Sequence, residues 1–340
     1  MLLTIALILV FIVLVASLFR KLNIPLILIA LAIGIVFGSD VTGLIYLDDA
    51  VLVRDAANIA LVFILFAGGF GTKRENLRPV FRPVILLATA GVLLTAAITA
   101  VGFHWLGGWP LERSLLLSIV ISSTDAAAVF SILRSRTVKT QVAVIAEIES
   151  AANDPMAIVA TTFMIQTLAG NGTRAYVSLL DLAWRLSAGV ALGVAVGFLA
   201  AAGFKRIRSI DIGYHYIYLI GVILLAFSLA EAGRASGMLA VFFAGLVMGN
   251  RKLPLKSGIA SFTAGLSFIA NVGLFILLGL LVFPRQFARI WLPGMLVFLI
   301  ITFVGRPLTV FLCTLFEKYS LREKVFLSWS GVRGSVPIVL

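Results

Sequence analysis

The chain has 340 residues, of which 61% are hydrophobic and 12% are charged, and its mean hydropathy is +1.13. Soluble domains carry about twice that fraction of charged residues, so this composition excludes an ordinary soluble protein. The formal net charge is +12, but the basic residues follow alternate apolar segments, as an orientation signal does, and this argues against nucleic-acid binding.

Apolar runs long enough to cross a bilayer follow one another along the chain, separated by short charged loops. We predict twelve membrane spans, at about residues 2–19, 24–38, 56–70, 83–105, 113–133, 142–168, 178–203, 212–231, 236–249, 260–283, 291–315 and 325–340. No basic residue precedes the first span, which indicates a retained helix rather than a cleaved signal peptide. The last span reaches Leu340 without a polar flank, so we expect the natural chain to continue with at least one more helix.

The basic residues are distributed unequally between the two sides of the predicted membrane. The loops after odd-numbered spans hold 18 of the 27 basic residues, namely Arg20, Lys21, Lys73, Arg74, Arg78, Arg82, Arg134, Arg136, Lys139, Lys205, Arg206, Arg208, Arg251, Lys252, Lys256, Lys318, Arg322 and Lys324. The loops after even-numbered spans hold 7. Because Lys and Arg gather in cytoplasmic loops, we predict a multi-pass protein of the plasma (inner) membrane with its N-terminus outside.

The span from Val142 to Leu168 carries an unusual set of polar residues. It contains the carboxylates of Glu147, Glu149 and Asp154, each of which costs roughly 2.5–3.5 kcal/mol at the centre of a membrane helix. Such residues are kept where they face a cavity lined by protein or water and act there. Pro155 has no amide proton, so one helical carbonyl nearby is left able to accept a cation or water.

Helical spacing sorts these residues onto two neighbouring faces. Glu147, Ser150 and Asp154 follow i, i+3, i+7 spacing and share one face. Glu149 and Asn153 follow i, i+4 spacing and share a face about 100° away. An acid, an amide, a hydroxyl and a free carbonyl are therefore expected to come together within one helical turn, and they supply hard oxygen ligands for a desolvated cation.

Two of the predicted spans are interrupted in corresponding ways. Span five contains the polar run 122–128 (SSTDAAA), and span twelve contains 330–337 (SGVRGSVP). Because the two spans run in opposite directions, this pair of interruptions predicts an inverted-repeat secondary transporter with two broken helices. Asp125 can neutralise the positive N-terminal ends of the half-helices, and Arg333 can neutralise their negative C-terminal ends.

These motifs resemble the monovalent cation/proton antiporter-1 family, and most closely its NhaP-type, cell-volume-regulation branch of potassium/proton antiporters. The resemblance is carried by Ser122–Phe130, by Glu149–Pro155, by Gly331–Pro337 and by the glycine-rich run Gly237–Asn250. It extends along all 340 residues in order.

The resemblance implies an all-α membrane fold of thirteen helices, built as two inverted six-helix repeats with two crossing broken helices. Residues 1–340 then form a single antiporter domain, with repeats at about 1–170 and 210–340 and a linker helix at about 178–203. It also implies a core domain that moves against a dimerisation domain, a homodimer, and a role in pH homeostasis and cell-volume regulation.

By the same resemblance, Asp154 exchanges a monovalent cation for a proton. Asn153 stands where the electrogenic relatives have a second Asp, which implies electroneutral one-for-one exchange, and Asp125 belongs to the ion- and proton-binding set. One departure concerns span three, where relatives have a carboxylate and this chain has Ala67. The choice between K⁺ and Na⁺ is therefore left open.

The resemblance also assigns partners around the ion. Thr124, Ser150 and Asp154 are expected to contact the monovalent cation, and Glu149 is expected to pair with Arg333. A Glu149–Arg333 pair can equally be a structural lock that never touches the ion. No cofactor is expected beyond the transported cation and proton.

Two other functions compete with antiport. An intramembrane aspartyl protease could use Asp125 and Asp154 as a dyad, but the chain lacks a Gly-x-Gly-Asp sequence and that chemistry gives Arg333 no role. A passive cation channel is the second alternative, although paired broken helices fit alternating access better. We therefore predict a transporter rather than an enzyme.

Arg306 is a further charged residue in an apolar span. It lies directly before Pro307 in the span at 291–315. We expect it to cap a helix end or to extend its guanidinium to the membrane interface, rather than to bind the ion.

Overall fold

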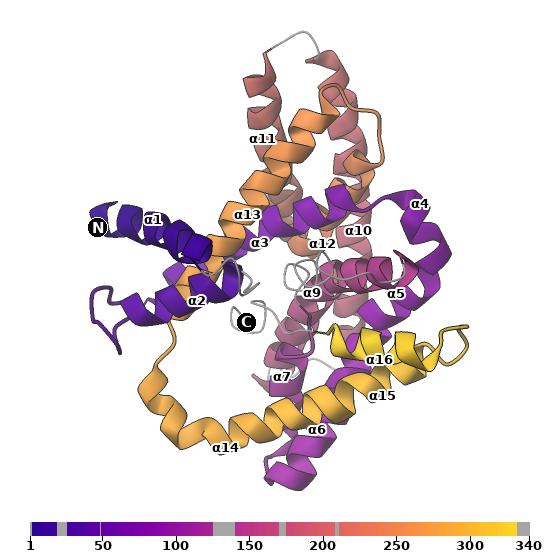
Figure 1. Cartoon of the computed structure of the whole chain (residues 1–340). Helices are drawn as coiled ribbons and strands as arrows, with labels where there is room; N and C mark the ends of the chain where they lie inside the picture. The colour runs from indigo at the N-terminus through magenta and orange to yellow at the C-terminus, as the bar shows by residue number, and fades with distance from the viewer. Residues whose placement is uncertain are drawn as a thin grey trace.

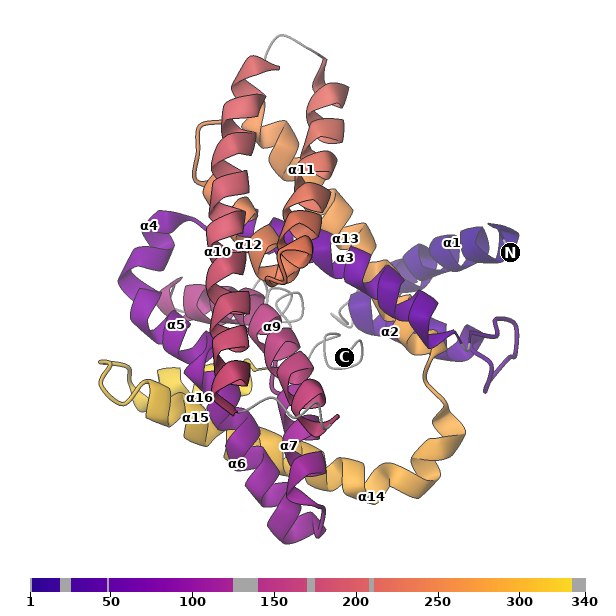
Figure 2. The same ribbon diagram turned by 180° about the vertical axis from the view of Figure 1, so that it is seen from behind.

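The computed structural model describes residues 2–18, 26–47, 49–124, 140–169, 175–207 and 211–331, and the regular structure of these residues is helical (Figures 1 and 2). The helices are α1 (Leu2–Leu18), α2 (Leu26–Phe37), α3 (Ala50–Gly71), α4 (Arg74–Leu77), η2 (Arg78–Val80), α5 (Phe81–Ala88), α6 (Ala90–Gly107), α7 (Leu111–Val120), α9 (Thr140–Leu168), α10 (Ala175–Arg206), α11 (Ile212–Ala232), α12 (Gly237–Gly249), α13 (Lys256–Leu280), α14 (Pro284–Ile300), η3 (Ile301–Gly305), α15 (Arg306–Cys313) and α16 (Leu321–Trp329). The predicted all-α class is confirmed.

Within this described part, six helical segments are long and apolar enough to cross a bilayer: Val51–Gly71, Arg74–Gly107, Ala183–Arg206, Ile212–Ala232, Lys256–Leu280 and Trp291–Cys313. Four shorter apolar helices accompany them, at Ala6–Val15, Leu26–Phe37, Met156–Leu168 and Gly237–Gly249. Together with α7 and α16 they follow the order of the twelve predicted spans.

The predicted interruptions fall where two helices end. α7 ends at Val120 and α16 ends at Trp329, each just before its polar motif. Residues 125–139 and 332–340, which include Asp125 and Arg333, lie outside the described residues. The helix ends at Val120 and Trp329 therefore agree with the predicted interruptions. The crossing of the two broken helices stays a prediction.

Two spans that the sequence predicts as continuous are instead divided. Thr89 separates α5 from α6 and places its hydroxyl on the Ile85 carbonyl at 2.6 Å, a side-chain bond that competes with the helical ladder. Between α14 and α15 the helix widens into the π-turn η3 directly before Arg306 and Pro307. A proline in a helix removes one hydrogen bond and crowds the preceding turn, so an extra residue in that turn accommodates it.

One group of helices surrounds the largest hydrophobic core, which α3, α10, α11, α12 and α13 share; α1 and α2 pack beside it. α12 is held very close to α3. A Cβ atom added at Gly69 would collide with the Phe242 backbone, and one at Gly245 with the Phe66 backbone. Only glycine permits this backbone approach, so the α3–α12 contact is rigid.

A second group forms a separate core from residues of η2, α5, α9, α15 and α16, and α6 and α7 pack onto α9 through Ala96, Ile119 and Ala160. In Figure 1 the helices α6, α7 and α15 lie low in the view and α11 lies at the top, while Figure 2 shows α10 running from beside α11 down past α5. α9 contacts members of both groups, including α5 and α7 on one side and α3, α10 and α12 on the other. The candidate site therefore lies on the helix that joins the two groups.

Candidate functional site

Three α9 residues that the sequence selects are buried near the middle of this helix. Glu149, Ser150 and Asn153 are 1%, 2% and 1% exposed. α9 continues through Pro155, so the proline does not end it. Asp154 also belongs to α9, but its side chain lies outside the described residues. Polar groups at this depth need partners, because an unpaired one costs about 1–3 kcal/mol.

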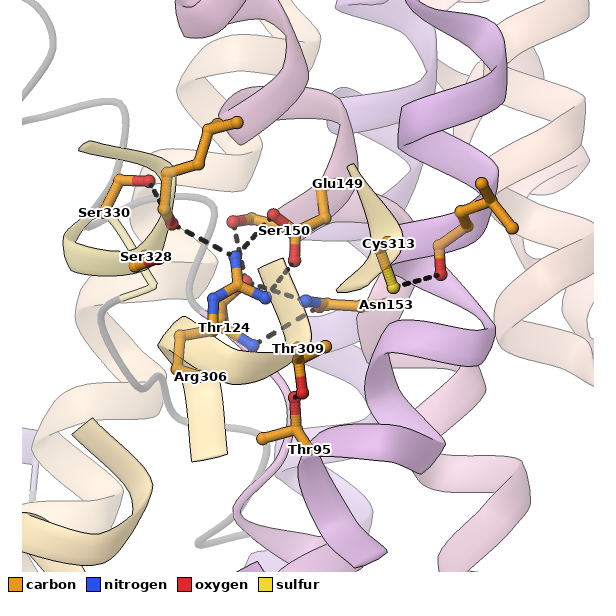
Figure 3. Close-up of polar contacts among 12 residues, drawn as sticks. Thr95, Thr124, Glu149, Ser150, Asn153, Arg306, Thr309, Cys313, Ser328 and Ser330 are labelled. Carbon is orange, nitrogen blue, oxygen red and sulfur yellow. Dashed lines mark hydrogen bonds and ion pairs between the residues drawn. The ribbon is translucent and has the colours of Figure 1, made fainter. Parts of the chain in front are cut away.

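The first set of partners comes from Thr124, which follows α7 (Figure 3). Its hydroxyl lies 2.8 Å from the Ser150 hydroxyl and accepts a 2.7 Å bond from the Asn153 side-chain amide. Thr124 itself is fully buried. Two of the predicted ion-contact residues, Thr124 and Ser150, are thus brought together with Asn153, and Thr124 joins the two faces of α9 that the helical spacing separates.

The end of α7 explains why Thr124 reaches α9. The helix stops at Val120, and the Ser122 hydroxyl donates to the Ile119 carbonyl at 2.6 Å. Beyond the helix, the Thr124 backbone amide has no helical acceptor. It donates instead to the Asn153 side-chain oxygen at 3.4 Å. Asn153 therefore binds both the backbone and the side chain of Thr124.

The second set of partners is an ion pair between α9 and α15. Arg306 Nη1 and Nη2 each lie 2.7 Å from one oxygen of Glu149. The two side chains are 4% and 1% exposed. A bidentate arginine–carboxylate pair is short and directional, and burial makes either charge costly without the other.

Arg306 also binds the end of α16. Its Nη2 donates to the Leu327 carbonyl at 3.4 Å, in the last turn of that helix. The last carbonyls of a helix carry partial negative charge, so a guanidinium is favourable there. Gly331 packs directly on this arginine, because a Cβ added at Gly331 would lie 2.6 Å from Arg306 Nε. One arginine thus connects α15, α9 and the end of α16.

The expectation that Arg306 reaches the membrane interface was wrong, whereas its bond to the Leu327 carbonyl agrees with the expected helix-capping contact. Arg306 neither extends to the membrane interface nor merely caps a helix, because it is 3% exposed and paired with Glu149. The predicted Glu149–Arg333 pair stays a prediction, since Arg333 is not among the described residues. A usable signal was present: an arginine inside an apolar span requires an acid at the same depth.

A hydrogen bond outside this set orients α15. Thr95 of α6 and Thr309 of α15 are joined at 3.1 Å, and both are buried. Just before α15, a Cβ added at Gly305 would lie 2.5 Å from the Thr99 hydroxyl. The close contact with α6 holds the first turn of α15, from which Arg306 reaches α9.

The chemistry of the site follows from these groups. Thr124, Ser150 and Asn153 offer neutral oxygens in a dry environment, and the Glu149–Arg306 pair carries no net charge. Hard oxygens suit alkali cations better than soft metals. Among the described residues, no group of three or more His, Cys, Asp or Glu side chains is placed to hold a metal ion.

Several named antiporters are similar to this chain. The K(+)/H(+) antiporter NhaP2 of Shewanella oneidensis is 35% identical over 331 residues, covering 96% of this chain and 58% of that protein. The K(+)/H(+) antiporter NhaP of Alkalimonas amylolytica is 33% identical over 322 residues, covering 94% and 56%. The Na(+)/H(+) antiporter 1 of Methanocaldococcus jannaschii is 31% identical over 347 residues, covering 96% and 79%.

The fold agrees with these similarities. The structure of the sodium proton antiporter MjNhaP1 from Methanocaldococcus jannaschii at pH 8 superposes with a TM-score of 0.84 at 28% identity, covering 98% of this chain and 83% of that one. The chain spans little more than half the length of the NhaP2 and NhaP relatives. The family model for the transmembrane region of sodium/hydrogen exchangers matches residues 6–340. The chain therefore belongs to the sodium/hydrogen exchanger family, a family of membrane transporters.

Proposed function

We propose that this protein is a secondary active antiporter that exchanges K⁺ or Na⁺ for protons, with Asp154 binding cation or proton competitively. The observation that carries the proposal is the buried hydrogen-bonded cluster of Thr124, Ser150 and Asn153, located on and against the helix that contains Asp154. The names of the similar proteins, K(+)/H(+) and Na(+)/H(+) antiporters, support the same activity.

Competition at one carboxylate couples the two ions. A cation that enters the site requires the Asp154 carboxylate to be ionised, and a returning proton displaces the cation. Glu149 and Arg306 cancel each other's charge, so of the neighbouring acids Glu149 and Asp154, Asp154 is the one that changes charge during the proposed cycle. One proton then moves for each monovalent cation, and exchange is electroneutral.

Thr124 and Ser150 are the neutral ligands in this proposal. Each hydroxyl can donate one hydrogen bond and accept two, so their mutual bond can be exchanged for a bond to the cation. Asn153 then holds Thr124 in place through its side-chain amide. Alternating access would follow from rocking of the second helix group against the first, about a site on α9.

The orientation of the protein in the membrane is proposed from its basic loops. The basic loops predicted as cytoplasmic include those after α3 and α12, and Asn250 joins these two loops by hydrogen bonds. Their common position supports a multi-pass orientation with the N-terminus outside the plasma (inner) membrane. We propose a homodimer, with roles in pH homeostasis and cell-volume regulation, from the family resemblance.

Proteoliposomes test the proposal directly. Proton flux is followed while K⁺, Na⁺ and Li⁺ are titrated with the membrane potential clamped, for the wild type and for Asp154→Asn. We expect cation-dependent proton flux in the wild type and none in Asp154→Asn, with unchanged thermal stability and membrane insertion. Exchange above about a tenth of wild type in Asp154→Asn at any pH would contradict the assignment. Cation flux that ignores the opposing proton gradient would indicate a channel instead.

A further inference from the structure

Two basic segments far apart in sequence meet at one corner of the molecule. The side-chain amide of Asn250, which follows α12, donates to the Thr72 and Leu246 carbonyls, each at 2.8 Å. Its oxygen accepts a 2.7 Å bond from the Arg74 backbone amide. One side chain therefore fixes the start of α4 against the end of α12.

This arrangement concentrates positive charge. The corner carries five exposed cations, Lys73, Arg74, Arg251, Lys252 and Lys256. The nearby acid in these two segments is Glu75. Among the described side chains, these cations have no carboxylate partner.

The cations are held next to apolar surface at the end of a membrane helix. The Arg251 guanidinium lies 4.3 Å from the centre of the Phe198 ring on α10, a contact that orients it. Phe198 and its neighbour Leu199 are exposed, as is Leu255 on the loop after α12. Lys256 Nζ donates to the Gly249 and Arg251 carbonyls and thereby holds this loop.

We propose that this corner is a binding site for the phosphate headgroup of an anionic phospholipid. Lys73, Arg74, Arg251 and Lys252 would contact the phosphate, and the acyl chains would lie along Phe198, Leu199 and Leu255. Cations beside apolar side chains match the boundary between headgroups and acyl chains. A soluble anion would leave those three apolar side chains unused, which favours the lipid.

The site differs from a general orientation signal in how it is built. An orientation signal needs only basic residues in a loop. Here two loops are joined by two hydrogen bonds of Asn250, to the Thr72 carbonyl and from the Arg74 amide, and Arg251 is held over an aromatic ring. The site should therefore depend on which cations are removed, and on Asn250, which carries no charge.

Thermal unfolding of the purified full chain in detergent measures binding, with phosphatidylglycerol or phosphatidylcholine added as the lipid. The corner variant is Lys73→Gln/Arg74→Gln/Arg251→Gln/Lys252→Gln. The matched control, Lys205→Gln/Arg206→Gln/Lys318→Gln/Arg322→Gln, removes the same charge from exposed positions at the end of α10 and at and before the start of α16. Native mass spectrometry counts the bound lipids in each sample.

We expect phosphatidylglycerol to stabilise the wild type and the control, and phosphatidylcholine to stabilise neither. Each cation near a membrane surface strengthens binding of an anionic lipid about fivefold, so the corner variant, which lacks four cations, should bind phosphatidylglycerol more than about a hundredfold more weakly. Asn250→Ala retains every cation and should also lose part of the lipid-induced stabilisation, measured against its own lipid-free unfolding temperature.

Three outcomes would overturn the proposal. An equal loss of phosphatidylglycerol-induced stabilisation in the corner variant and in the control would mean that surface charge alone attracts the lipid. If phosphatidylglycerol stabilised the corner variant as much as the wild type, the lipid would bind at another site. Stabilisation by inorganic phosphate or glycerol 3-phosphate equal to that by phosphatidylglycerol would indicate a site for a soluble anion instead of a lipid.

Discussion

One turn of α9 faces two different polar environments. Glu149 meets the guanidinium of Arg306 through two bonds of 2.7 Å, whereas Ser150 and Asn153 meet the Thr124 hydroxyl at 2.8 and 2.7 Å. The distances are nearly equal and all these side chains are buried. We call Glu149 and Arg306 the charged half of the site, and Thr124, Ser150 and Asn153 its neutral half. The two halves differ in charge, whereas their contact distances are nearly the same.

This difference separates a fixed contact from exchangeable ones. Both oxygens of Glu149 are used by Arg306, and either charge left alone in the interior is very costly. In the neutral half, each hydroxyl can change its role between donor and acceptor, so a bond can be replaced at little cost. The charged half is suited to hold α9, α15 and α16 together, and the neutral half to receive an ion.

Removal of one partner of the charged half should give the largest effect. Arg306→Ala leaves the Glu149 carboxylate buried and unpaired, so we expect a loss of about 3–5 kcal/mol in stability. Glu149→Ala should cost a similar amount, and the double variant should recover much of the loss. Thermal unfolding of the four proteins in one detergent measures the coupling.

The same cycle with Arg333 serves as the comparison. A coupling confined to Glu149 and Arg306 would place the ion pair where the structure has it. The stability losses of the Glu149 and Arg306 variants could instead be strictly additive, with strong coupling between Glu149 and Arg333. That result would identify Arg333 as the partner of Glu149, as the family resemblance implies.

Addition of a charge to the neutral half should alter what is transported per cycle. Asn153→Asp places a second carboxylate next to Asp154, and the two acids would titrate as a coupled pair. The site could then carry two protons against one cation, moving one net charge for each turnover. A net charge couples transport to the membrane potential by about 2.3 kcal/mol per 100 mV.

Asn153→Asp could also give a different result. Arg306 could exchange Glu149 for the new Asp, which would leave the stoichiometry unchanged. Proteoliposome flux, with the potential set by an ionophore that does not carry K⁺, separates the two results. If Asn153→Asp is active and its rate ignores voltage, Asn153 is only a hydrogen-bonding residue that positions Thr124.

The neutral half was largely predictable from the sequence, because its residues are related by local rules. Ser150, Asn153 and Asp154 are close in any helix, and the polar interruption of span five places Thr124 at the end of a half-helix. The hydroxyl contact between Thr124 and Ser150 needed the packing of α7 on α9, which helical spacing alone does not give.

The charged half was not predictable in the same way. Glu149 and Arg306 are 157 residues apart, so no helical period relates them. The π-turn that precedes Arg306 adds a residue to its helix and rotates the positions after it, which a period of 3.6 residues does not anticipate. Pro307 lies in the first turn of α15, which begins at Arg306 and continues to Cys313.

Loss of one hydroxyl should weaken the neutral half without unfolding the protein. Thr124→Val removes the acceptor of the Asn153 amide and the partner of Ser150. We expect a stability loss of about 1–3 kcal/mol. We also expect a half-saturating cation concentration about tenfold higher in proton-flux assays. Thr124→Ser, which retains the hydroxyl, is the control and should keep most of the affinity. An unchanged half-saturating concentration in Thr124→Val would remove Thr124 from the ion site.

The smallest effect is expected at the Thr95–Thr309 hydrogen bond, which lies outside both halves. Thr95→Val and Thr309→Val each remove one member of a buried bond of 3.1 Å between α6 and α15. A neutral hydrogen bond contributes about 0.5–1.5 kcal/mol, and the double variant should lose less than the sum, because neither hydroxyl is left unpaired. The half-saturating cation concentration should stay at the wild-type value, since this bond positions α15 and not the ion ligands. A shift in cation affinity as large as that of Thr124→Val would mean that the ion site extends to α6 and includes residues outside both halves.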